Sequence, residues 1–79
     1  MSGRPKNLTA AALRHGLRSD VSIEDAGAEL AGMVNGDRRL IEVAVSRIRG
    51  ALTQRPGPVG RYAREALELA LALSQPRFP

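Results

Sequence analysis

The sequence predicts an all-α protein, a compact bundle of four short helices at about residues 8–18, 22–35, 37–54 and 58–74. Two observations predict this class. Glycine and proline divide the chain of 79 residues into segments that favour helix, most of which repeat apolar residues every three or four positions. No segment alternates apolar and polar residues as a strand would. We expect one domain over residues 1–79, with flexible ends at 1–6 and 76–79.

Each predicted helix has a local start signal. Asn7 or Thr9 can cap the first helix, because a side-chain oxygen at this position accepts a free backbone amide. Ser22 opens the second helix in a pattern similar to a capping box, and Asp37 can cap the third. Pro58 suits the first turn of the fourth helix, where its missing N–H has no cost.

The stop signals are equally local. Asn35 and Gly36 tolerate the left-handed backbone that ends a helix. The turn at 55–57 contains proline and glycine and is short enough to set the third and fourth helices antiparallel, as the main hairpin of the bundle. Gly27 lies on the apolar face of the second helix, where it would let another helix approach closely.

The third helix has the clearest two-sided pattern. Its apolar arc, about 140° wide, contains Leu40, Ile41, Ala44, Val45, Ile48, Ala51 and Leu52. A separate polar arc of about 100° contains Arg38, Arg39, Glu42, Ser46, Arg49 and Thr53. We therefore expect one side to pack on the bundle and the other to face solvent or a partner.

The fourth helix is apolar over about 200°, which is too wide for one packing surface. Either this helix lies at the centre of the bundle, or part of its face contacts a partner outside it. The candidate protein-interface residues on this face are Tyr62, Leu67, Leu69, Leu71 and Leu73. On the polar side, Arg61–Glu65 and Arg64–Glu68 have the spacing of ion pairs within a helix.

Composition argues against catalysis and cofactors. The chain has no cysteine and one histidine, His15, so it lacks the residues for disulfides, zinc or iron–sulfur sites. We find no nucleophile elbow, phosphate loop or metal-binding histidine pair. The acids at 24, 25 and 29 have the pattern of a solvated face. We expect no enzyme activity, no cofactor or metal, and no small-molecule substrate.

The sequence also lacks a membrane signal. The charged start is not followed by an apolar signal region, and the longest apolar run is far shorter than the ~20 residues of a membrane span. We therefore expect a cytoplasmic protein without membrane contact.

Charge is distributed unevenly along the chain. The net charge is +4, but residues 1–19 and 38–79 are basic and residues 20–37 are acidic. Nucleic acid is one partner class that basic segments suggest. Its candidate residues are Arg4, Lys6, Arg38, Arg39, Ser46, Arg49 and Thr53. Glu42 within the same arc, the scarcity of aromatic residues and an arginine content that GC-rich coding also produces all weaken this interpretation.

The leucine-rich face of the fourth helix favours a protein partner. We therefore expect a small non-catalytic regulatory or adaptor protein that acts by protein–protein contact. Self-association through the fourth helix, most simply as a homodimer, would also compensate for the small core of so short a chain. The alternative is a small basic nucleic-acid-binding protein that uses the third helix and the amino-terminal arm.

Overall fold

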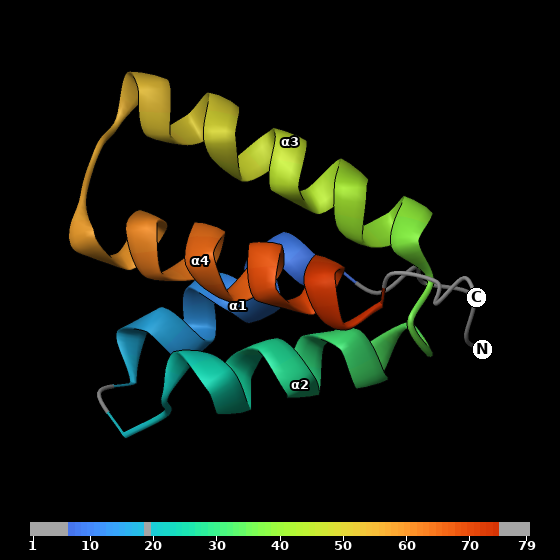
Figure 1. The fold of residues 1–79 in the computed structure, drawn as a ribbon. Coiled ribbons are helices and arrows are strands. Elements are labelled where there is room, and N and C mark those ends of the chain that lie inside the picture. The colour runs from blue at the N-terminus through green and yellow to red at the C-terminus, as the bar shows by residue number, and fades with distance from the viewer. Residues whose placement is uncertain (1–6, 19, 75–79) are drawn as a thin grey trace, which may run out of the picture.

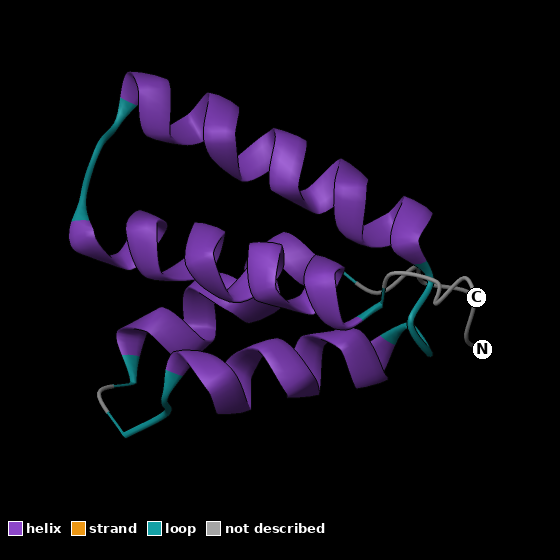
Figure 2. Cartoon of the chain, in the orientation of Figure 1, coloured by secondary structure: helices purple, strands orange, loops and turns teal. Residues whose placement is uncertain are grey.

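A computed structural model describes residues 7–18 and 20–74 of the chain. It contains helices α1 (Leu8–Leu17), α2 (Ile23–Met33), α3 (Arg38–Gln54) and α4 (Pro58–Leu73), and no strand lies within those ranges (Figures 1 and 2). The all-α four-helix prediction is confirmed. The ends predicted to be flexible, 1–6 and 76–79, lie outside the described residues.

The predicted start signals act as expected. The side chains of Asn7 and Ser22 each accept a hydrogen bond from the amide three residues later, at 3.0 Å and 3.1 Å. The side chain of Asp37 accepts from the amide two residues later, at 3.0 Å. α4 begins without a side-chain cap, with Pro58 in its first turn. Of the two candidates for the first cap, Asn7 is therefore the one that the structure uses.

A left-handed pair ends α2. Asn35 has φ 54° and Gly36 has φ 72°. The Gly36 amide donates to the carbonyl of Ala31 at 2.9 Å, and the Asn35 amide donates to the carbonyl of Gly32 at 3.2 Å. These two bonds satisfy carbonyls that the end of a helix leaves free. As a result α2 ends at Met33, two residues before the predicted boundary.

α4 lies at the centre of the fold. Figure 1 shows it between α3 and α2, with α1 behind, and it contacts all three. Its residues Ala63, Ala66, Leu67 and Ala70 are fully buried. α3 and α4 are antiparallel neighbours and make the most extensive contact between consecutive helices, which confirms the predicted main hairpin, and α4 packs still more extensively against the non-consecutive α2.

Small side chains dominate the core. Among the described residues, seven of the fourteen buried apolar residues are alanines, and the largest fully buried side chains are Leu30, Ile41, Ile48 and Leu67. Alanine contributes little volume, so the helices must lie close together to exclude water. Gly27 makes this possible between α2 and α4. A methyl group there would lie 2.8 Å and 2.9 Å from Cδ2 and Cγ of Leu69, which is closer than carbon atoms can pack.

Adding that methyl group should destabilise the protein. We expect Gly27→Ala to lower the free energy of unfolding by about 1 kcal/mol, because an overpacking cost of about 2 kcal/mol exceeds the gain in helix propensity of about 1 kcal/mol. Gly32→Ala is the matched control in the same helix, since a methyl group there meets no atom within 4 Å. It should stabilise by up to about 1 kcal/mol. Urea unfolding measures both, and equal stabilisation by the two variants would contradict the close contact.

Candidate interaction surfaces

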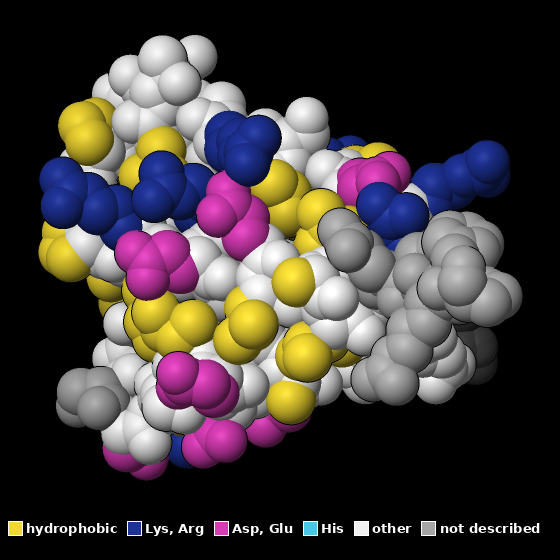
Figure 3. All heavy atoms as spheres, viewed as in Figure 1, with side chains coloured by type: hydrophobic (Ala, Val, Ile, Leu, Met, Phe, Trp, Pro, Cys, Tyr) yellow, Lys and Arg dark blue, Asp and Glu magenta, His cyan; other side chains and the backbone are white. Residues whose placement is uncertain are grey.

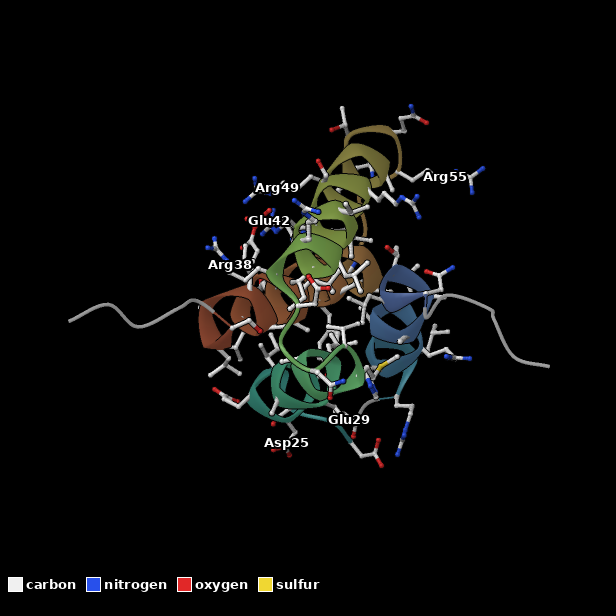
Figure 4. The ribbon with its side chains drawn as sticks, turned by 90° about the vertical axis from the view of Figure 1, so that its right-hand side faces the viewer. Asp25, Glu29, Arg38, Glu42, Arg49 and Arg55 are labelled. Carbon is white, nitrogen blue, oxygen red and sulfur yellow. The ribbon has the colours of Figure 1, made fainter. Side chains whose placement is uncertain are left out.

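Ion pairs neutralise much of the predicted basic face of α3. Arg38 lies 3.2 Å from Glu42 on the same helix. Arg49 reaches Glu68 of α4, with Nη2 and Nε at 2.7 Å and 3.2 Å from one carboxylate oxygen. Figure 4 shows Arg38, Glu42 and Arg49 on one flank of α3. Solvent reaches both arginine side chains, so the ion pairs add little stability. The paired acids, however, lie where a nucleic-acid phosphate would have to bind.

The other nucleic-acid candidates fall into two groups. Thr53 donates its hydroxyl proton to the carbonyl of Arg49 at 3.1 Å. Arg39 and Ser46 are exposed, and the described part of the chain offers neither of them an ion pair or a side-chain hydrogen bond. Arg4 and Lys6 lie outside the described residues. Among residues 7–18 and 20–74, the predicted candidates therefore form no cluster of free cations on this face.

The ion pairs predicted within α4 do not form. No side-chain contact within 4 Å joins Arg61 to Glu65 or Arg64 to Glu68 in the described residues. Glu68 instead turns toward α3, because the antiparallel packing places Arg49 opposite it. Spacing along one helix could not reveal this contact, since its partners are 19 residues apart.

The five apolar candidates of α4 have different environments. Leu67 is fully buried, so it is part of the core and offers no surface to a partner. Leu71 is partly buried against the core, and Leu69 is partly buried beside Gly27. Leu73 is 57% exposed. Because α4 is the central helix, most of its wide apolar arc is used inside the molecule, and the exposed part is limited to its last turns.

The last turns of α4 and the end of α2 form a neutral surface. A methyl group on Gly36 would lie 3.7 Å from the Ser74 hydroxyl oxygen, which shows that the two helix ends are adjacent. Neither 30–36 nor 69–74 contains a charged residue. We call these two segments the end patch. In Figure 3, yellow apolar side chains separate the charged groups over α3 and α4 from the acidic groups over α2.

In the described part of the chain, three further large apolar side chains are exposed that were not predicted as interface candidates. Leu17 is 74% exposed, Leu40 is 50% exposed and Val43 is 48% exposed. Leu40 and Val43 lie on α3 beside its contact with the amino-terminal end of α1. Leu40 was assigned to the packing arc, but it lies about 80° from the centre of that arc at Ile48. That angular offset is the signal in the sequence that could have identified it.

Acidic side chains cover the outer surface of α2. Asp25 and Glu29 extend from the opposite side of the molecule to α3 (Figure 4). Glu29 also lies 2.9 Å from Nε2 of His15, whose side chain is only 12% exposed, so this contact links α2 to α1. Within the described residues, no three histidine, cysteine or acidic side chains come together to hold a metal ion. The separation of charge seen along the sequence therefore becomes a separation between two faces.

Tyr62 ties α4 to the loop that precedes α2. Its hydroxyl donates to the carbonyl of Val21 at 2.8 Å, and the carbonyl of Ser22 lies 3.3 Å away. Partial burial raises the pKa of Tyr62 above 10.0, and the nearby Asp25 carboxylate raises it further. This candidate interface residue thus has a contact within the molecule that the helical pattern did not reveal.

The raised pKa of Tyr62 predicts a loss of stability in alkali. The folded state favours the neutral phenol, so the stabilisation is complete below pH ~10 and is lost as the pH rises through the raised pKa. Tyr62→Phe should lose about 1 kcal/mol at neutral pH and lack this alkaline component. Because the chain has one tyrosine, phenolate absorbance reports its titration directly. Identical alkaline slopes in the two proteins would contradict the raised pKa of Tyr62.

Comparison with known proteins adds no relative: no family model, curated protein or solved structure matches this chain. Within residues 7–18 and 20–74, no helix has both the length and the apolar character needed to cross a membrane. The surfaces that remain for a partner are the end patch, the exposed apolar residues of α3, and the acidic outer face of α2.

Proposed function

We propose that this chain is a small non-catalytic binding protein, with an adaptor or regulatory role, that acts through contacts with protein molecules. A second copy of the chain is one such partner, bound through the end patch. The observation that supports this is the 57% exposure of Leu73 at the end of a helix whose other leucines are partly or wholly buried.

The chemistry of the end patch favours contact between identical surfaces. In a twofold dimer each patch meets its own copy, so any net charge on it would be repelled. The end patch has none. Burying an exposed leucine stabilises a contact by up to about 1.5–3 kcal/mol. The patch is small, so we expect a weak dimer rather than an obligate one.

Nucleic-acid binding is the less supported proposal. Its α3 arginines at 38 and 49 already contact acids, which a phosphate would have to displace or tolerate. Arg39 and Ser46 have no such contact in the described residues, and Arg4 and Lys6 lie outside those residues. Too few free cations share this face to give the strongly salt-dependent binding that phosphate contacts produce.

Sedimentation velocity over a wide concentration range tests self-association. We expect the mean mass of the wild-type protein to rise with concentration. Leu73→Ser should shift that rise to concentrations at least about tenfold higher, since both copies of a twofold dimer lose the leucine and the summed loss exceeds about 1.4 kcal/mol. Leu17→Ser is the matched control, because it removes an even more exposed leucine from α1.

Thermal unfolding of the same variants separates a surface effect from a folding effect. Both leucines are more than half exposed, so each variant should remain folded with nearly unchanged stability. A wild-type protein that stays monomeric at every concentration would contradict the proposed dimer. An equal effect of Leu17→Ser and Leu73→Ser would place the contact elsewhere.

A further inference from the structure

Two hollows follow one another along the seam between α1 and α3. The first is lined by Leu8 of α1 and by Leu40, Val43 and Arg47 of α3. The second is lined by Leu13 of α1, by Leu52 and Arg55 near the end of α3, and by Val59 of α4. Each has a volume of about 260 Å³. We call the two hollows together the α1–α3 groove.

The α3 side of the groove runs along most of the helix. Its lining residues are 40, 43, 44, 47, 48, 51, 52, 54 and 55. These positions cover about half of the circumference of α3, over a length of about 22 Å. Leu40 and Val43 are half exposed on it, so the groove has apolar surface to bury. A bound helix of about four turns would match this length.

The charge of the groove is positive throughout. Arg47 and Arg55 line its two hollows, and neither has an ion pair in the described part of the chain. α1 contains no acidic residue, and the single acid of α3, Glu42, pairs with Arg38. Figure 4 shows this pair on the opposite flank of α3, whereas Arg55 extends on the side of α1.

This charge decides between the possible occupants. Two copies of the groove facing each other would bring four unpaired arginines together, and like charges at an interface are costly. A partner segment with apolar side chains on one face and carboxylates beside them would satisfy both the exposed leucine and valine and the free arginines. Arginine is well suited to this role because its planar fork can bind a carboxylate through two hydrogen bonds.

We propose that the α1–α3 groove binds an acidic amphipathic helix of a partner protein. Leucine-like anchors at i, i+4, i+7 and i+11 fill the two hollows, and acidic residues flanking them pair with Arg47 and Arg55. This surface is separate from the end patch, so the proposal does not depend on the proposed dimer.

The test is fluorescence anisotropy with designed labelled peptides of about 18 residues, or five helical turns. One peptide has leucines at i, i+4, i+7 and i+11 with glutamates beside them. A second keeps the leucines and replaces each glutamate by lysine. A third keeps the glutamates and replaces each leucine by serine. We expect the first peptide to bind at least about tenfold more tightly than either of the others.

Charge reversal in the protein separates recognition from folding, because a loss of protein stability would weaken binding of every peptide and could not reverse the preference between two of them. Arg47→Glu combined with Arg55→Glu should reverse the preference, so that the lysine peptide binds more tightly than the glutamate peptide. Arg14→Glu combined with Arg61→Glu is the matched control. It makes the same change in net charge at exposed arginines that do not line the groove, and it should keep the original preference. Val43→Ser should weaken binding of both leucine-containing peptides.

Several results would overturn the proposal. Equal binding of the glutamate and lysine peptides, or an unchanged preference after charge reversal, would show that the groove does not select acidic partners. Failure of all three peptides to bind would show that it is not a helix site. Binding of mixed-sequence duplex DNA that is lost only in the groove double variant would assign these arginines to nucleic acid. A rise of the mean mass with concentration that is present in the wild-type protein and weakened by Val43→Ser would assign the groove to a second copy.

Discussion

The need for one helix to pack against three others constrains the whole structure. α4 presents fully buried alanines at 63, 66 and 70, with Leu67 as its one large buried side chain. Such small residues exclude water only if the neighbouring helices lie close. Gly27 provides that proximity from α2, and Tyr62 fixes the start of α2 by its hydrogen bond to Val21. We therefore expect the free energy of unfolding to depend on these contacts.

The central position of α4 determines which surfaces are left for partners. A wide apolar arc is compatible with a central helix or with an exposed binding helix, and here three neighbours cover most of it. Two apolar surfaces remain. One is the neutral end patch beside Leu73, and the other is the side of α3 that lies beyond its contact with α4. The first has no charge and the second is lined by arginine. Their different chemistry suggests different partners.

Local signals in the sequence were sufficient for the fold class and most helix boundaries. Caps such as Asn7, Ser22 and Asp37 act within one helical turn, so their roles can be read from neighbouring residues. The left-handed stop at Asn35 is equally local. Gly27 could also be predicted as a close approach, because it interrupts an apolar face.

The surfaces were harder to predict because they depend on which helices become neighbours. The burial of Leu67 and the pairing of Glu68 with Arg49 follow from the packing of α4, which periodicity does not specify. Likewise, Leu40 is exposed because it lies at the edge of the contact between α3 and the amino-terminal end of α1. Residues Arg4 and Lys6 were predicted from charge alone and lie outside the described structure.

Amide hydrogen exchange followed by NMR tests the central position of α4 most directly. Amides that exchange only through global unfolding belong to the most stable part of a protein. We predict that the amides of residues 63–70 exchange most slowly in the chain and that the free energy of their opening equals the free energy of global unfolding. If these amides exchange faster than those of α2 and α3, then α4 is a peripheral helix and its central position is contradicted.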